Sequence, residues 1–233
     1  MDKIFLKKNF HFILNKPQLS ENIGMSIRSI GCFGFKKIDL INPRNSWPNV
    51  KGLSASKHFT SIAKKVKIFS TIPEAIKKSD LVIATTVRQR DIKIPQIQIN
   101  DIKKINAKNI SVLFGQENNG LSNKEISYAN YILTIPTSNQ SSLNLSHTVS
   151  IIAYELSQLD GLKLTSKNSY YLKSDQIENF IKFLMKTLDK RRFTTISSKK
   201  VNLEISIRNF LKTSKIDEKS LKTAYGILKN ITK

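Results

Sequence analysis

The chain has 233 residues and a formal net charge of +22, from 39 Lys and Arg against 17 Asp and Glu. Its single cysteine and three scattered histidines exclude a disulfide framework and show no metal-ligand spacing, so we expect no metal and a reducing compartment. We find no apolar run long enough to cross a bilayer and no secretory leader pattern, and we therefore expect a cytoplasmic protein without a membrane partner.

The positive charge is spread unevenly along the chain. Residues 1–160 hold 22 basic against 11 acidic residues, and residues 161–233 hold 17 against 6. The C-terminal part is therefore about twice as charge-dense. An excess of this size attracts polyanions through counterion release, which makes nucleic acid the leading partner. General enrichment of lysine by an AT-rich genome is the alternative explanation.

Apolar, β-prone runs alternate with helical patterns over the first two thirds of the chain. Strands are predicted at residues 10–14, 37–41, 66–69, 81–86, 110–114 and 131–135. Helices are predicted after the potential cap Asn22, over residues 54–64, after Pro73, at the capping box Ser122–Glu125, and over residues 145–156. This alternation predicts an α/β domain with a parallel sheet covered on both faces. Its ligands should bind at the carboxyl ends of the strands, near the loops 85–90, 115–120 and 136–144.

The C-terminal part has a different pattern. Residues 160–173 lack periodicity and are predicted to be a linker. Three amphipathic helices follow, around residues 177–188, 203–211 and 221–228. We therefore divide the chain into a domain at 1–159, a linker at 160–173 and a basic helical module at 174–233. The basic residues between its first two helices, among them Arg191 and Arg192, could contact RNA or form a solvated face.

Three segments together have a specific family pattern. They are ENIGMSIRS at 21–29, LFGQENNGL at 113–121, and IP at 135–136 followed by SSLNL at 141–145. In this order and spacing they resemble the three motifs of the SpoU branch of the SPOUT RNA 2′-O-ribose methyltransferases. The segments DLINPR and TTVRQR and the C-terminal helical extension are similar to the members that methylate the first anticodon-loop ribose of tRNA.

The resemblance implies a fold, a reaction and partners. The fold would be a SPOUT domain with a parallel sheet and a C-terminal trefoil knot, followed by the small helical module. The activity would be 2′-O-methylation of tRNA by S-adenosylmethionine, on the cytidine or uridine at the first position of the anticodon loop. The enzyme would be a homodimer whose subunits together compose each active site.

The resemblance also implies site residues. The cofactor pocket would be lined by Thr85, Thr86, Val87, Gly115, Gln116, Glu117, Ile135, Pro136, Ser142, Leu143 and Asn144. The catalytic group would be Arg28, Asn22, Ser142 and Asn144, and the RNA contacts Arg28, Arg88, Arg90, Arg191 and Arg192. Three positions depart from the family pattern: Ile27 and Ser29 replace alanines beside Arg28, and Gln116 stands where relatives often have arginine.

Methyl transfer from a sulfonium requires in-line positioning and loss of the hydroxyl proton, and it requires no metal. The family proposal makes Arg28 a base. A guanidinium is very hard to deprotonate and grips phosphate well, so we expect Arg28 to position the RNA and stabilise the developing alkoxide.

Two other functions fit the same residues. The enzyme could methylate ribosomal RNA or another tRNA ribose, because fold and cofactor motifs do not specify the RNA. A non-catalytic RNA-binding protein could also keep this fold, although the intact motif residues argue against it.

Overall fold

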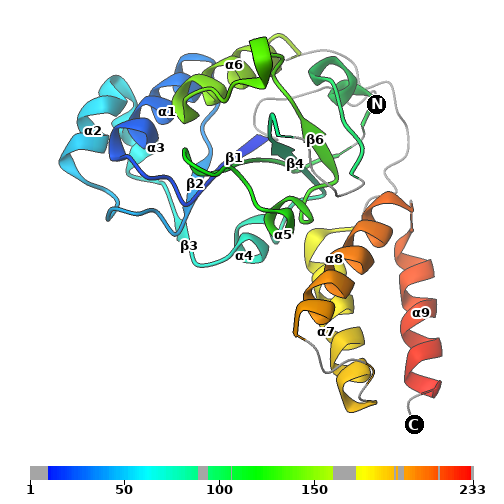
Figure 1. The fold of residues 1–233 in the computed structure, drawn as a ribbon. Helices are drawn as coiled ribbons and strands as arrows, with labels where there is room; N and C mark the ends of the chain where they lie inside the picture. Colours follow the sequence, from blue (N-terminus) through cyan, green and yellow to red (C-terminus); the bar gives the residue numbers. More distant parts are fainter. Residues whose placement is uncertain are drawn as a thin grey trace.

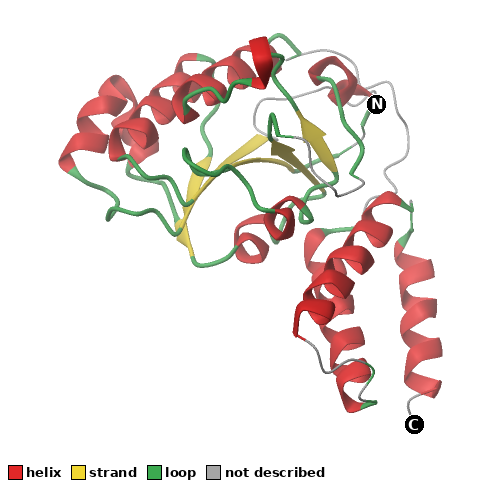
Figure 2. Cartoon of the chain, viewed as in Figure 1, coloured by secondary structure: helices red, strands yellow, loops and turns green. Residues whose placement is uncertain are grey.

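A computed structural model describes residues 10–88, 94–105, 107–159, 172–191, 193, 197–214 and 216–231. Figures 1 and 2 show two parts, an α/β domain and a group of three helices. Of the helices in the described ranges, none combines the length and the apolar character that a bilayer span requires.

The first part is built on one parallel sheet, as predicted. Its strands are β1 (Phe10–Asn15), β2 (Ile38–Ile41), β3 (Ile68–Phe69), β4 (Leu81–Thr85), β5 (Ile110–Phe114) and β6 (Tyr131–Leu133). They lie in the order β3-β2-β1-β5-β4-β6, and each neighbouring pair is parallel. β1, β2 and β5 are buried along their whole length, which explains their continuous apolar runs. The trefoil knot stays a prediction.

Helices cover both faces of the sheet, and each face has its own apolar core. One face carries α1 (Ser20–Cys32), α2 (Val50–Ser56), α3 (Thr60–Ala63) and α6 (Leu145–Ser157), and the other carries α4 (Ile72–Ile76) and α5 (Asn123–Ile126). Figure 1 shows these two groups on opposite sides of the strands. Short 3₁₀ helices lie at η2 (Lys57–Phe59), η3 (Ile99–Lys104) and η4 (Ser138–Gln140).

Several predicted elements have different bounds. The helix expected over residues 54–64 is divided, because Lys57 has a φ of 50° that interrupts α2. The strands expected at 66–69 and 131–135 are shorter, and η3 and η4 were not predicted. The prediction that Asn22 caps its helix is wrong, because α1 begins at Ser20 and Asn22 lies inside its first turn.

Two glycines allow α1 and α2 to approach closely. A Cβ on Gly24 would lie 2.1 Å from the carbonyl oxygen of Gly52 and 2.7 Å from Cβ of Ala55. A Cβ on Gly52 would lie 2.1 Å from the ring of Trp47. Because neither position has room for a methyl group, backbone contact sets the distance between the helices.

The second part contains the three predicted helices, α7 (Ser174–Lys190), α8 (Ser197–Thr213) and α9 (Glu218–Ile231). They enclose a separate apolar core that includes Ile177, Phe180, Ile181, Met185, Leu211 and Leu221. Most of the predicted linker, residues 160–171, lies outside the described residues. The division into 1–159, 160–173 and 174–233 therefore stays a prediction.

Buried cations join the helical module to the sheet domain. Arg208 of α8 is 2% exposed and donates from Nε and Nη2 to the two carboxylate oxygens of Glu178, at 2.7 and 3.0 Å. Its Nη1 donates to Oγ of Ser127 at 3.2 Å, and its guanidinium lies 4.3 Å from the ring centre of Tyr128. Lys212 is also buried and donates to the carbonyl oxygen of Tyr128 at 2.6 Å. Both cations therefore donate hydrogen bonds to residues just after α5.

This junction predicts a pH-dependent stability. Burial lowers the pKa of Lys212 to about 7, while Glu178 opposes the shift and Arg208 adds to it. Above pH 7 the unfolded chain binds more protons at this lysine than the folded chain, so this group makes the unfolding free energy rise with pH by up to about 1.4 kcal/mol per unit. From pH 7 to pH 9, we expect the unfolding free energy of wild type to rise relative to that of Lys212→Met.

Urea unfolding at pH 7, 8 and 9 measures this difference. The control is Lys222→Met on α9. Because the Lys222 side chain is 75% exposed, the difference in unfolding free energy between wild type and this variant should stay constant over that range. A constant difference for Lys212→Met as well would mean that this lysine keeps its ordinary pKa.

Candidate active site

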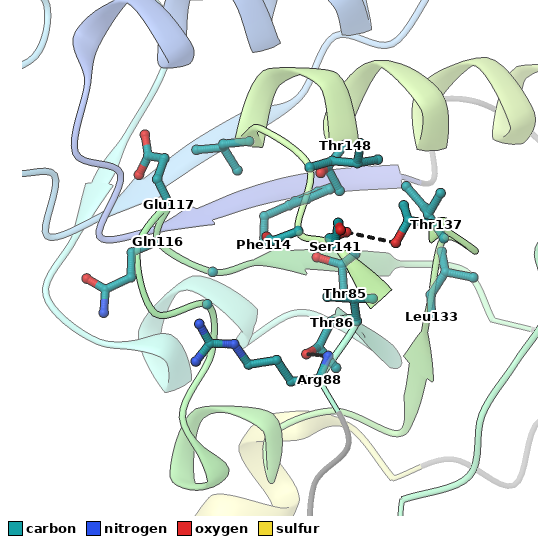
Figure 3. A pocket seen from close by; sticks show the side chains of 17 residues that line it. Thr85, Thr86, Arg88, Phe114, Gln116, Glu117, Leu133, Thr137, Ser141 and Thr148 are labelled. Carbon is teal, nitrogen blue, oxygen red and sulfur yellow. Dashed lines mark hydrogen bonds between the residues drawn. The ribbon is translucent and has the colours of Figure 1, made fainter. Parts of the chain in front are cut away.

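A pocket lies at the carboxyl ends of β4, β5 and β6, where the sheet topology predicts a ligand site (Figure 3). It contains about 710 Å³ of empty space, part of it open to solvent. The loop after β4, the loop after β5, and the chain from β6 into α6 form its walls. Two of the three family motifs therefore meet here.

Most of the residues expected to bind the cofactor line this pocket. They are Thr85, Thr86, Val87, Gly115, Gln116, Glu117, Ile135, Ser142 and Leu143. Pro136 and Asn144 are outside the lining. Prediction from sequence missed Phe114, Gly120, Leu133, Thr137, Ser141, Leu145 and Thr148, which also line the pocket. Thr148 follows the helix cap Asn144 by four residues, so helical spacing could have identified it.

The predicted RNA contacts are dispersed. Arg88 lines the pocket, and its Nη2 donates to the carbonyl oxygen of Asn118 at 3.3 Å. Arg191 lies at the C-terminal end of α7. It is on the order of 25 Å along the helix from Ser174, where α7 contacts the sheet domain. Arg90 and Arg192 lie outside the described residues.

A tight turn shapes the wall after β5. A Cβ on Gly115 would lie 2.3 Å from the carbonyl carbon of Gly120 and 2.5 Å from the amide nitrogen of Leu121. The amide of Gly120 donates to the carbonyl oxygen of Gln116 at 2.9 Å, and Gly120 itself has a φ of 64°. Glycine at both positions therefore permits this closed loop.

Glu117 ties this loop to the start of α1. Its Oε2 accepts from the amide of Gln18 at 2.8 Å, and its Oε1 accepts from the amide of Leu19 at 3.4 Å and from Nδ2 of Asn22 at 2.9 Å. The N-cap residue of α1, Leu19, supplies no side-chain cap. The carboxylate of Glu117 thus takes over part of the capping from a distant loop.

The hydrogen bonds continue from Asn22 to the third motif. Nδ2 of Asn144 donates to Oδ1 of Asn22 at 3.2 Å, and Oδ1 of Asn144 accepts from the amide and the hydroxyl of Ser146, both at 2.8 Å. Since a carboxylate only accepts, Glu117 sets the orientation of both amide groups. Asn22 is 2% exposed. The first and third motifs are thereby fixed to the second.

A second acidic residue holds the neighbouring strand end. Glu125 of α5 accepts from Nδ2 of Asn15 at 2.9 Å and from Nζ of Lys16 at 2.8 Å, and it completes the predicted capping box with Ser122. Burial tends to raise the pKa of Glu125, but the hydrogen bonds from Lys16, Ser122 and Asn15 outweigh it and lower the pKa to about 2. Glu125 is therefore ionised over the physiological range.

Arg28 lies outside the pocket lining, on the exposed side of α1. It makes no hydrogen bond or ion pair to any residue that the structure describes. Next to it, Oγ of Ser29 and Oγ of Ser150 lie 2.6 Å apart, so α1 and α6 touch here. The large apolar residues Met25, Ile151 and Tyr154 are exposed on the same two helices. One chain does not bring Arg28 into its own pocket.

Within the described ranges, no cluster of three or more His, Cys, Asp or Glu side chains could hold a metal ion. The pocket instead offers apolar walls, hydroxyl groups and backbone groups.

Comparison with known proteins gives several relatives. A tRNA (cytidine-2'-O-)-methyltransferase, TrmJ of Methanocaldococcus jannaschii, is 34% identical over 152 residues, which is 62% of this chain and 65% of that protein. The tRNA (cytidine/uridine-2'-O-)-methyltransferase TrmJ of Pectobacterium atrosepticum is 24% identical over 97% of both chains. The crystal structure of TrmJ from Z. mobilis ZM4 superposes with a TM-score of 0.84 at 28% identity, covering 96% of this chain and 99% of that one.

The Z. mobilis match includes the helical module, so the two-part organisation is shared with a solved structure. The sequence pattern of the SpoU rRNA Methylase family matches residues 9–154. That range contains the whole sheet and all three motif segments. Because it covers more than half of the chain, the protein belongs to the SpoU rRNA Methylase family.

Proposed function

We propose that this protein transfers a methyl group from S-adenosylmethionine to the 2′-hydroxyl of a tRNA ribose, the cytidine or uridine at the first position of the anticodon loop. The observation that carries the proposal is the pocket at the carboxyl ends of β4, β5 and β6. Glu117, which lies in the loop after β5, links this pocket to α1 through Asn22. The relatives named tRNA 2'-O-methyltransferases support tRNA as the substrate. Since tRNA functions in translation, we place the enzyme in the cytoplasm.

The residues present fit the proposed cofactor. The pocket lies at the carboxyl ends of parallel strands, where α/β proteins bind small ligands. Leu133, Ile135, Leu143 and Leu145 offer apolar contact for a flat base, and the hydroxyls of Thr85 and Ser142 are polar partners. When bound, S-adenosylmethionine supplies a methyl group that is already activated by its sulfonium.

The chain's own residues then have distinct roles. Arg28 holds an RNA phosphate and stabilises negative charge on the ribose oxygen, as its planar, permanently charged guanidinium suits. Ser142 lines the pocket, so its hydroxyl is available to a ligand bound there. Asn22 and Asn144 are positioning residues, because their amide groups are engaged with Glu117, Ser146 and each other.

A homodimer would bring Arg28 to a pocket. Arg28 lies beside an exposed apolar surface that includes Met25 and Ile151, 39% and 38% exposed, and Tyr154, 49% exposed. Apolar side chains of this size on adjoining helices favour burial against a partner. We infer that a second copy covers this face and that Arg28 serves the pocket of the partner subunit.

The direct test measures transfer of labelled methyl from S-adenosylmethionine to bulk tRNA and to ribosomal RNA, with mass mapping of the product. Label at the first anticodon-loop ribose supports the proposal. The family description names rRNA, so ribosomal RNA is the second candidate, and label there would move the substrate. No label in either RNA despite bound cofactor would contradict methyl transfer.

Arg28→Ala should abolish transfer and leave cofactor binding unchanged. Loss of a group that stabilises developing charge lowers the rate on the order of 100-fold or more. Arg28→Lys keeps the charge without the bidentate geometry and should retain part of the rate. Single-turnover transfer and calorimetric titration with S-adenosylmethionine measure the two properties. Near wild-type transfer by Arg28→Ala would refute the assignment.

Gly115→Ala should weaken cofactor binding, because the added Cβ collides with the backbone of Gly120. Overpacking costs about 1–3 kcal/mol, so a loss of about tenfold or more in affinity is expected. The control is Gly226→Ala on α9, where no atom lies within 4 Å of the added Cβ. If calorimetry gives equal cofactor affinities for the two variants, the turn at Gly115 does not contribute to the binding site.

Ile151→Asp should convert the dimer into a monomer, since it would bury an unpaired charge in the proposed interface. Val50→Asp is the matched control, because Val50 is 84% exposed on α2, which is not one of the two helices of the proposed interface. Sedimentation equilibrium measures the mass of each variant. A dimer that survives Ile151→Asp would exclude the α1 and α6 face as the interface.

A further inference from the structure

A second hollow lies at the opposite end of the sheet, where β1 and β2 begin, and has about 1270 Å³ of empty space that is partly open to solvent. The turns before β2 and β3 and the end of α4 frame it. Six lysines line it: Lys36, Lys37, Lys65, Lys67, Lys77 and Lys78. We call this surface the lysine basin.

The positive charge of the lysine basin is only partly compensated. All six lysines are exposed, and none of them has an ion-pair partner among the described residues. Only Asp39 and Glu74 supply acidic groups to the lining. A scattered surface lysine is ordinary, but six around one concave surface keep their charges close together and produce a focused positive potential.

The acidic groups of the basin are already engaged. Asp39 is 5% exposed; its Oδ2 lies 2.8 Å from Nε2 of His11, and its Oδ1 accepts from the amide of Lys67 at 2.8 Å. Glu74 accepts from the amide of Ser70 at 3.1 Å. Burial lowers the pKa of His11, so the imidazole adds no charge near neutral pH. The lining therefore keeps a positive excess, with six lysines against two carboxylates.

The chemistry of these groups indicates the ligand. Lysine ammonium groups on flexible stems bind phosphates as point charges and select no base. The lining has no arginine for bidentate contacts. Such a surface suits a run of several phosphates, as in a nucleic-acid backbone.

The lysine basin also adjoins the basic helical module. Ser79, which lines the basin, accepts through its carbonyl oxygen from the amide and the hydroxyl of Ser174, at 3.2 and 3.3 Å. Ser174 is the first residue of α7. On α7, Lys182, Lys186 and Lys190 are exposed and spaced four residues apart, so they form one row along the helix. Basic surface thus extends on both sides of this contact.

We infer that the lysine basin binds the phosphate backbone of the RNA substrate, at a site separate from the pocket that takes the reacting ribose. The two hollows lie at opposite ends of strands of up to six residues, which separates them by roughly 20 Å. The identity of the RNA as substrate rests on the proposed function. The binding of RNA phosphates in the basin rests on the lysines themselves.

The test replaces Lys37, Lys67 and Lys78 with glutamine in one variant of the full chain. The control variant replaces Lys51, Lys57 and Lys103 with glutamine. These lysines line neither hollow, and their replacement removes the same charge. Fluorescence titration with bulk tRNA at several salt concentrations gives affinity and its salt dependence. Each phosphate-contacting lysine contributes about one unit to the slope of log K against log salt. We expect the basin variant to lose about three units and the control variant to keep the wild-type slope.

Four further readouts separate the possible results: cofactor binding, circular dichroism, RNA methylation and binding of tripolyphosphate. Unchanged cofactor binding and circular dichroism support a local effect. A wild-type slope and affinity in the basin variant would overturn the inference, whatever methyl transfer shows. If no RNA is methylated yet the slope still falls, the proposed function fails and the RNA site stands. If the basin variant loses binding of tripolyphosphate but binds tRNA as wild type does, the site takes small phosphates and the RNA assignment is wrong.

Discussion

The arrangement of the three motif segments depends on the carboxylate of Glu117. It accepts from two backbone amides at the start of α1 and from Asn22, which in turn accepts from Asn144. A partly buried carboxylate with several donors is strongly bound in place, and losing it would leave buried N–H groups without acceptors. Loops that are about 100 residues apart in sequence thus have one relative position.

Much of the sheet domain could be predicted from local patterns. β4 and β5 are short apolar runs that are buried almost throughout, and α6 follows a regular apolar stripe from Leu145 to Leu156. The capping box at Ser122 was also recognisable from spacing. These elements follow from burial and from contacts within a few residues, which are the interactions that a single sequence displays.

Other features could not be predicted because their partners are distant in sequence. Asn22 has the residue type of a helix cap, but its side chain bonds to Glu117, 95 residues away. Arg208 and Lys212 have ordinary polar positions in an amphipathic helix, yet both are buried against residues more than 80 positions earlier. Only the tertiary structure shows that these polar groups are buried, because the spacing of residues in one sequence does not reveal contacts between distant segments. The placement of Arg28 outside the pocket of its own chain likewise depends on how α1 packs.

The close contact between α1 and α2 has a consequence for how this sequence can change. Gly24 faces the backbone of Gly52 and the methyl group of Ala55, and Gly52 faces Trp47. A larger residue at position 24 needs backbone movement at position 52, which replacement of one neighbouring side chain cannot provide. Single substitutions at these two positions are therefore not neutral. Descendants of this chain can change these glycines only through coordinated substitutions in both helices.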